Sequence, residues 1–322
     1  MWIAILILAA ALNGPAARKT PVLWSEPKPA GPAEWIWGPG GEAKAPRPPF
    51  RFIRENMGGT NPKVDVRDAR GTLWIVKFGG EVQTETFAAR FLNAVGYLAE
   101  PTYFVPAGVI EGAHGLTRAK PFIGRDGSFR WARFRIRDPK ELAYDDEIQW
   151  SWQRNPFLGT HELAGLKILL MLLSNWDAKD SRDGKGSNTA VFEKPAAEDP
   201  AYFYAFNDWG ASLGRWGGFL NRDRWDPAAY ERQTRRFARL DRSGAIVWGF
   251  HGKHNRDLTR GISVEDVCWL VRRLEGVDRE DVRLGLLASG ATARDADALA
   301  GSISTRIHQL ERIAASSQGE MK

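Results

Sequence analysis

Cysteine is nearly absent from this chain of 322 residues, since Cys268 is the only one. A single cysteine excludes an intramolecular disulfide and a zinc site built on several thiolates. Cys268 falls on the apolar stripe of an expected helix, which favours a small core residue over a nucleophile. Long apolar runs are missing too: the run at residues 1–12 is shorter than the roughly 20 residues that span a bilayer.

The apolar run at residues 1–12 is typical of the core of a signal peptide, because small residues follow it. We expect residues 1–17 to be a cleaved signal peptide, so that the mature chain begins between about Gly14 and Thr20. No transmembrane span is then expected after signal removal. The protein would be exported (periplasmic or secreted) if the signal is cleaved, and cytoplasmic otherwise.

Clustered positive charge is also missing. The formal charge of +6 arises from 45 Lys and Arg against 39 Asp and Glu, and the basic residues are scattered along the chain. No zinc finger, RNA-binding aromatic signature or basic heptad region accompanies them. We therefore expect no nucleic-acid partner.

Aromatic residues, by contrast, are abundant. The chain has 14 Trp and 16 Phe, and rings of this size need a core or a ligand groove to cover them. Prolines concentrate in residues 21–49, where fixed φ angles and missing donors oppose regular helix or sheet. We expect residues 18–49 to form an extended strap, which Trp24, Trp35 and Trp37 hold against the domain.

From residue 50 the pattern changes to short alternating stretches. Residues 50–55, 64–67 and 73–78 predict three strands of an antiparallel meander with glycine turns between them. Residues 84–95 have helical spacing, with their apolar side chains on one stripe. We therefore expect a small β-lobe over residues 50–135.

The second half of the chain, residues 136–322, is mainly helical. Thr160 can cap a helix that runs to about Ser174, and residues 168–173 within it are unbrokenly apolar. A helix that is apolar all round is buried all round. Further capping patterns start helices later in the chain, at Asp226, Ser263 and Thr292.

The order of these features resembles the protein-kinase-like superfamily, and distantly its HipA-like and phosphatidylinositol 3- and 4-kinase branches. A glycine turn between strands, a lysine on the third strand and a glutamate on the next helix follow each other in a kinase N-lobe. The stretch MGGTNPKVDVRD, followed by WIVKFGGEVQTE, is similar to the HipA pattern of a small-residue turn, Pro-Lys and Ile-x-Lys-Phe. The resemblance implies an α+β, two-lobed protein-kinase-like fold, with a small antiparallel β N-lobe and a mainly helical C-lobe.

The resemblance also implies contacts with ATP. The glycine turn would lay its backbone N–H groups over the phosphates, Lys77 would pair with them, and Glu85 would hold Lys77. Glu81 competes with Glu85 for the same lysine. The implied cofactor-binding residues are Gly58, Gly59, Thr60, Lys63, Lys77 and Glu85.

The loop after the apolar helix carries the residue types of a kinase catalytic loop: an Asp for the attacking hydroxyl, a Lys for the transferring phosphate and an Asn for Mg²⁺. Asp177, Lys179 and Asn188 follow in that order, with six residues more between the Asp and the Asn than in kinases. Asp183 has the better spacing, but we choose Asp177 because it directly follows the most buried helix. Asp208, in an Asp-Trp-Gly turn after an apolar strand, stands where a second Mg²⁺ ligand belongs.

These residues predict an ATP- and Mg²⁺-dependent phosphotransferase that acts on a hydroxyl of an unknown protein, lipid or small molecule. Residues 182–187 have the composition of a mobile loop, and we expect their deletion to be tolerated. One alternative is a catalytically inactive, kinase-like binding protein in an exported compartment. A second is a serine hydrolase, because Ser212 lies in a G-x-S-x-G pattern with His251 and His254 downstream. The two histidines also suggest a metal, but no third ligand is evident, which favours a surface loop.

Overall fold

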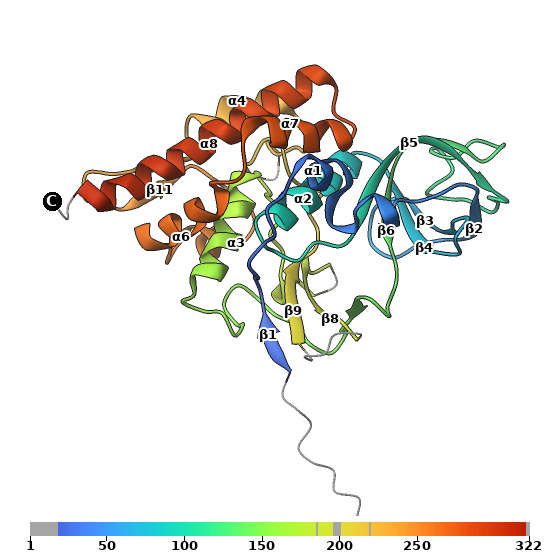
Figure 1. Cartoon of the computed structure of the whole chain (residues 1–322), viewed down its shortest axis with the longest axis horizontal. Coiled ribbons are helices and arrows are strands. Elements are labelled where there is room, and N and C mark those ends of the chain that lie inside the picture. The colour runs from blue at the N-terminus through green and yellow to red at the C-terminus, as the bar shows by residue number, and fades with distance from the viewer. Residues whose placement is uncertain (1–18, 185, 196–200, 219, 320–322) are drawn as a thin grey trace, which may run out of the picture.

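The computed structural model describes residues 19–184, 186–195, 201–218 and 220–319. The expected signal peptide, residues 1–17, lies outside them. The chain forms a β-barrel, at the right of Figure 1, and a mainly helical lobe. The expected α+β class with two lobes is confirmed. Within the described ranges, no helix is long and apolar enough to cross a membrane.

The first lobe is a closed barrel of five strands in the order β2-β3-β4-β6-β5. These are β2 (Phe50–Glu55), β3 (Lys63–Arg67), β4 (Leu73–Phe78), β5 (Thr102–Glu111) and β6 (Ser128–Ile136). Neighbouring strands pair antiparallel, except that β2 and β5 pair in parallel and close the barrel. The three predicted strands are confirmed, whereas the parallel closure departs from the expected meander, because it joins strands that no local pattern links.

Alternation along the strands decides which barrel side chains reach the second lobe. Val76 on β4 and Phe134 on β6 are fully buried in the barrel core. Lys77 and Arg133 are their neighbours in sequence, so they point out of the barrel. The helix α2 (Val82–Ala94) follows β4 and packs against β5 and β6, which brings its side chains to this outer face.

The N-terminal segment contains more regular structure than the sequence predicts. Its strand β1 (Thr20–Val22) pairs in parallel with β9 (Ala201–Phe206), and its helix α1 (Pro32–Trp37) precedes two 3-10 turns, η1 (Gly38–Gly40) and η2 (Glu42–Lys44). The expectation of a strap without helix or sheet is therefore wrong. Pro32 occupies the start of α1, where a helix needs no N–H donor.

The tryptophans of the strap pack as expected. Trp35 is 1% exposed and contacts Phe91 of α2 edge to face. Trp24 makes the same kind of contact with Trp269. The strap is thus fixed to both α2 and the helical lobe, as Figure 1 shows for α1 beside α2.

The helical lobe is built around α3 (His161–Leu172), which Thr160 caps by accepting from the backbone N–H of Leu163. Residues 168–173 are all fully buried, as the apolar run predicts. The remaining helices are α4 (Pro227–Thr234), α5 (Asn255–Thr259), α6 (Val264–Leu274), α7 (Arg279–Ala288) and α8 (Ala293–Gly319). The helix starts expected at Asp226, Ser263 and Thr292 are confirmed.

Two small sheets complete the second lobe. The strands β7 (Ala143–Tyr144) and β8 (Thr189–Glu193) join β9 and β1 in the order β1-β9-β8-β7. The hairpin of β10 (Ala238–Leu240) and β11 (Ile246–Trp248) lies apart from it. The strands β8 and β9 pair antiparallel after the loop that follows α3. Asp208 stands two residues after the end of β9.

Candidate active site between the lobes

Lys77 on β4 and Glu85 on α2 form a buried ion pair, with 2.7 Å between Nζ and Oε1. Arg133 on β6 contacts the same carboxylate. Burial alone would raise the pKa of Glu85, but Arg133 and Lys77 outweigh it and lower that pKa to about 2. Glu85 therefore stays ionised and holds Lys77 in place.

Glu81 is a second partner of Lys77, with 2.8 Å between Oε2 and Nζ. Asn61 donates to the same oxygen at 2.6 Å, and Arg224 contacts the other carboxylate oxygen. The sequence left Glu81 and Glu85 as competitors, and in the structure they share the lysine. Gly210 lies against Glu81 so closely that a Cβ there would be 2.4 Å from the Glu81 carboxyl carbon.

Asp208 adds a third carboxylate to this cluster. Oxygen atoms of Glu81, Glu85 and Asp208 all lie within 4.8 Å of one another. Burial and the charge of Glu85 raise the pKa of Asp208, and Lys77 opposes the change. Lys77, Arg133 and Arg224 already contact Glu81 and Glu85. Among the described residues no cationic side chain forms an ion pair with Asp208, so a further cation would be stabilised at this carboxylate.

Asp177 and Asn188 touch although eleven positions separate them in sequence: Nδ2 of Asn188 donates to the carbonyl oxygen of Asp177 at 2.6 Å. The N–H of Asn188 donates to the carbonyl of Lys179 at 3.2 Å, and Nζ of Lys179 lies 2.7 Å from Oδ2 of Asp177. The carbonyl of Asn188 accepts from the N–H of Asn207, next to Asp208. The extra residues between Asp177 and Asn188 therefore loop out.

Indole and backbone donors fix the carbonyl groups on both sides of Asp177. Trp152 Nε1 donates to Ala178 at 2.9 Å, and the N–H of Lys253 donates to Trp176 at 2.8 Å. A buried carbonyl without a donor is costly, so these contacts restrict the backbone to one path. Asp177 consequently sits on a rigid support.

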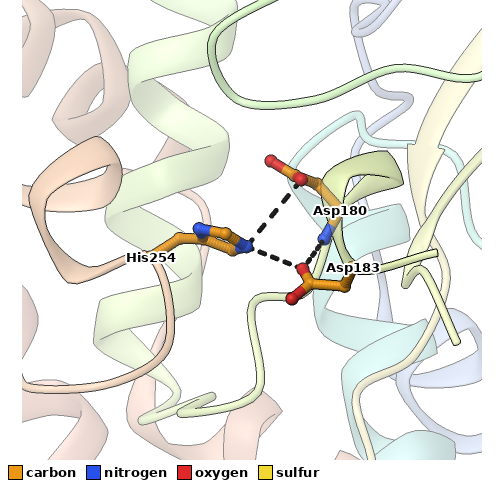
Figure 2. Close-up of side chains that lie close together, drawn as sticks. All are labelled: Asp180, Asp183 and His254. Atoms are coloured by element: carbon orange, nitrogen blue, oxygen red, sulfur yellow. Dashed lines mark hydrogen bonds and ion pairs between the residues drawn. The ribbon is translucent and has the colours of Figure 1, made fainter.

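Asp183, the rival of Asp177, points into a different cluster. Its carboxylate lies 2.5 Å from Nζ of Lys253 and 2.7 Å from Nε2 of His254, and Figure 2 shows the histidine facing it. Burial alone would raise the pKa of Asp183, but Lys253 and His254 outweigh it and lower that pKa to about 2. These contacts hold Asp183 away from the side chains of Asp177 and Asn188.

The structure adds detail that two expectations about this region did not contain. Ser181–Asp183 forms the 3-10 turn η3, capped by Asp180, so this part of the segment is a hydrogen-bonded turn. His254 is half-buried among acids rather than on a surface loop, whereas His251 is exposed. The sequence could not show this, because the partners of His254 lie some seventy positions away.

The glycine turn lies between β2 and β3. Gly58 and Thr60 are exposed and, within the described residues, contact none of the other candidates. Lys63 begins β3 directly opposite Lys77, and burial together with the charge of Lys77 lowers the pKa of Lys63. No acidic side chain pairs with Lys63 in the described part of the chain, so an anion would be favoured beside it.

A cavity of about 490 Å³ opens where the lobes join, in the size range of small-molecule sites. Its apolar walls come from the barrel strands and from the sheet of the second lobe: Ile75, Ile136, Pro139, Leu142 and Phe192. Arg135, Arg137 and Asn207 are among its polar residues. Asn207 immediately precedes Asp208 in the chain, but Lys77, Glu85 and Asp208 do not themselves line the cavity.

No family model matches this chain, and no curated protein matches it. A crystal structure of the Golgi casein kinase covers 84% of this chain and 75% of its own, with 11% identity and a TM-score of 0.39. A crystal structure of the Golgi casein kinase with Mn/ADP bound covers 85% and 74%, with 10% identity and a TM-score of 0.39. The nearer resemblance to HipA and phosphatidylinositol kinases stays a prediction, and the function proposed below rests on the geometry of the site.

Ser212, the nucleophile of the hydrolase alternative, has no base. Its side chain is fully buried, and Oγ has no hydrogen-bond partner among the described residues. An activated serine needs a base within hydrogen-bond reach. Neither His251 nor His254 provides one, so the arrangement of a serine hydrolase is not formed.

Sequence reasoning missed Arg306 on α8, which supports the start of the catalytic loop. Its fully buried guanidinium donates to the carbonyl of Leu172 at 2.7 Å and to Oγ of Ser174 at 2.8 Å, at the end of α3. It also lies over the ring of Tyr230, 3.6 Å from the centroid. Burial lowers the pKa of Arg306 to about 10. Helical periodicity marks this position as buried, but no sequence signal names its partners.

Acid is expected to weaken the fold through Glu85. Its folded pKa of about 2 lies below the ordinary 4.5, so its contribution to stability is complete above pH 4.5 and is lost as the pH falls toward 2. The difference in Tm between wild type and Glu85→Gln should therefore be largest above pH 4.5 and shrink toward pH 2. Thermal unfolding followed across this range tests it, with the exposed Glu231→Gln as control. A difference that stays constant with pH would contradict the prediction.

Proposed function

We propose that this protein is an ATP- and Mg²⁺-dependent phosphotransferase that acts on a hydroxyl acceptor. One observation carries the proposal: Lys77, its glutamate partner Glu85 and Asp208 meet in one buried cluster. A lysine–glutamate pair beside a metal-binding aspartate is the arrangement that aligns and neutralises phosphates in protein kinases.

Asp208 and Asn188 are suited to hold Mg²⁺, which prefers oxygen ligands. Burial and the charge of Glu85 raise the pKa of Asp208, so a cation beside this carboxylate would favour its ionised form. The amide of Asn188 donates through Nδ2 to the carbonyl of Asp177, which leaves Oδ1 for a cation. When bound, the ion would supply the charge that stabilises phosphate oxygens during transfer. Glu81 joins these residues as a candidate ligand of the same cluster.

ATP fits the cavity between the lobes. Its apolar walls suit a purine ring. The phosphates would have to extend beyond the cavity to reach Lys77 and Asp208, which do not line it. Lys63, beside Lys77 in the sheet, offers a second positive charge to the phosphates. The turn Gly58, Gly59 and Thr60 would close over them with backbone N–H groups.

Asp177 is proposed to orient the acceptor hydroxyl and accept its proton, and Lys179 to contact the transferring phosphate. The two side chains form an ion pair, with 2.7 Å between Nζ of Lys179 and Oδ2 of Asp177, so they lie side by side as these two roles require. The acceptor is an unidentified protein, lipid or small molecule. Export, which residues 1–17 predict, would place this chemistry outside the cytoplasm.

Binding of MgATP is the first test, because it shows whether nucleotide binds at Lys77 and Asp208 or elsewhere on the protein. ATP with Mg²⁺ should raise the Tm of the full chain, and Lys77→Ala and Asp208→Ala should each abolish most of this rise. Asp208→Ala should also remove its dependence on Mg²⁺. The matched control is Lys120→Ala, an exposed lysine on the same lobe.

The outcomes are distinct. Equal stabilisation of wild type, Lys77→Ala and Asp208→Ala would place nucleotide binding elsewhere. Stabilisation of wild type without phosphate transfer to any acceptor class would favour the inactive, kinase-like binding protein.

A further inference from the structure

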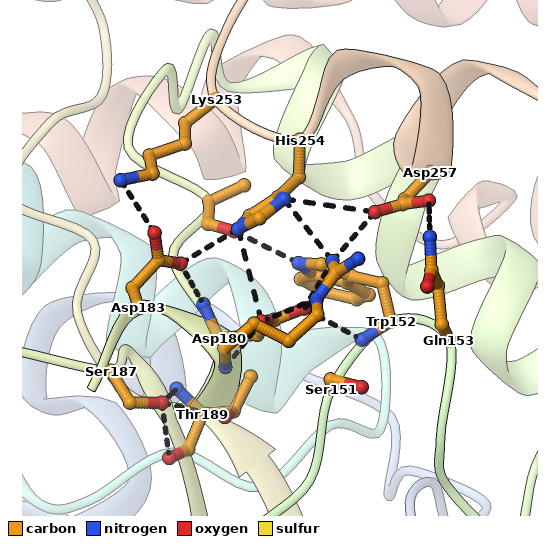
Figure 3. Close-up of polar contacts among 12 residues, drawn as sticks. Ser151, Trp152, Gln153, Asp180, Asp183, Ser187, Thr189, Lys253, His254 and Asp257 are labelled. Carbon is orange, nitrogen blue, oxygen red and sulfur yellow. Dashed lines mark hydrogen bonds and ion pairs between the residues drawn. The ribbon is translucent and has the colours of Figure 1, made fainter.

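A polar cluster joins the segment between Asp177 and Asn188 to the turn that begins α5 (Figure 3). Its members are Asp180, Arg182, Asp183, Lys253, His254 and Asp257. We call this cluster the loop clasp. It lies outside the carboxylate cluster around Lys77 and uses none of its residues.

Two acids of the segment, Asp180 and Asp183, connect it to the rest of the protein. Asp180 is fully buried and accepts from the backbone N–H of Trp152 at 2.9 Å and from that of Arg182 at 3.0 Å. Asp183 accepts from the N–H of Asp180 at 3.0 Å and lies within 2.7 Å of both Lys253 Nζ and His254 Nε2. The first acid therefore anchors the segment to the core, and the second anchors it to the turn.

Arg182 makes the cluster an ion-pair network rather than a metal site. Its Nη2 lies 2.6 Å from a carboxylate oxygen of Asp180 and 2.6 Å from one of Asp257. Asp180, Asp183 and His254 have ligand atoms within 4.8 Å of one another, but the cations of Arg182 and Lys253 already neutralise both acids. A divalent ion would have to displace them.

His254 connects the two halves through both ring nitrogens. Nε2 faces the carboxylate of Asp183 at 2.7 Å, and Nδ1 lies 3.1 Å from Nη2 of Arg182. Arginine can only donate, so Nδ1 accepts and Nε2 carries the hydrogen. A neutral His254 thus supplies one donor and one acceptor, which a glutamine side chain could also supply.

The segment needs such support because its composition opposes order. Gly184, Gly186, Ser181 and Ser187 lie in it, and ordering such residues costs conformational entropy. Its far end is Asn188, whose amide must stay 2.6 Å from the carbonyl of Asp177. Backbone hydrogen bonds to Lys179 and Asn207 also hold Asn188, so the clasp would act on this contact through the segment and in addition to them.

We propose that the loop clasp holds Asn188 against Asp177, with His254 as a positioning residue for both. The expected effect of the clasp on Mg²⁺ binding and phosphate transfer rests on the function proposed above. Its expected effect on the order of the segment between Asp177 and Asn188 does not, because that effect follows from the contacts alone. In this proposal the residues between Asp177 and Asn188 form a fixed segment that supports the site. Deletion of residues 182–187 should then disturb the site rather than be tolerated.

The test compares His254→Leu with His254→Gln in the full chain. Leucine removes both polar contacts, whereas glutamine can keep a donor toward Asp183 and an acceptor toward Arg182. Amide hydrogen exchange between Asp180 and Asn188 should rise about tenfold or more in the leucine variant and stay within about threefold of wild type in the glutamine variant. His251→Leu, at an exposed histidine of the same loop, is the control.

A second readout addresses the site. The Mg²⁺ concentration that gives half of the MgATP-dependent rise in Tm should increase about tenfold in His254→Leu and little in His254→Gln. If His254→Leu fails to fold, Lys253→Met, which removes the other contact to Asp183 at a partly exposed side chain, should raise exchange in the same segment.

The two proposals can fail separately. Equal exchange in the leucine and glutamine variants, with wild-type Mg²⁺ dependence, would overturn the clasp even if MgATP binds. No MgATP effect on the wild-type protein would overturn the proposed function, while a higher exchange in His254→Leu than in His254→Gln would still support the clasp.

Discussion

Asp177→Asn is expected to lower the rate of phosphate transfer by about 10²- to 10⁴-fold, the usual contribution of a positioned general base. Asparagine preserves the shape of the side chain but cannot accept the proton. The carbonyl of Asp177, which receives the amide of Asn188, is unchanged by the substitution. Stabilisation by MgATP should therefore remain close to wild type, so that the loss appears in turnover and not in nucleotide binding.

Asp183→Asn is the matched comparison for this prediction. Asp183 lies in the loop clasp against Lys253 and His254, so its substitution should lower transfer by roughly tenfold or less, through the position of the loop. Steady-state phosphate transfer to a responsive acceptor, with MgATP-dependent Tm measured beside it, distinguishes the two aspartates. An inactive Asp183→Asn with an active Asp177→Asn would show that the assignment is reversed.

Arg306→Ala is expected to cause the largest loss of stability, about 3–5 kcal/mol. The side chain is fully buried, so its truncation opens a cavity beneath the end of α3. It also removes the donors to Leu172, Ser174 and Tyr230. A change of this size should lower the Tm by on the order of 5–15 °C.

Two further variants separate the causes of that loss. Arg306→Met keeps most of the volume but none of the hydrogen bonds, so its Tm should fall between those of wild type and Arg306→Ala. Arg312→Ala, at an exposed arginine of the same helix, should change the Tm by little. Equal effects of Arg306→Ala and Arg312→Ala would refute a structural role for the buried guanidinium.

Much of the fold could be predicted from local patterns. The three strands from Phe50 to Phe78 follow from alternation and glycine turns, and α3 follows from its apolar run and the cap at Thr160. These elements depend on neighbours within a few positions. The helix in the strap was not predicted, because a high proline content opposes regular structure in general, whereas Pro32 stands at the first position of α1, where proline is favourable.

The sequence suggested the residue types of the candidate site but not which of these side chains contact each other. The order of the chain placed Lys77 before Glu85, and the structure joins them. The sequence could not show whether Glu81 or Glu85 binds the lysine, because the two are only four positions apart. In the structure Glu81 is the N-cap residue of α2, Glu85 lies in its first turn, and both bind Lys77. The choice between Asp177 and Asp183 stays a prediction, and Asn188 contacts the backbone carbonyl of Asp177 although the sequence spacing favours Asp183.

The sequence by itself determined the elements, the buried helix and the types of charged residue that follow it, because periodicity and capping act over short distances. Only the tertiary structure decided the closure of the barrel, the partners of His254 and the support of α3 by Arg306. Those contacts join residues sixty or more positions apart. They depend on how packed elements bring distant backbone and side-chain groups into a buried space, where each polar group must find a partner.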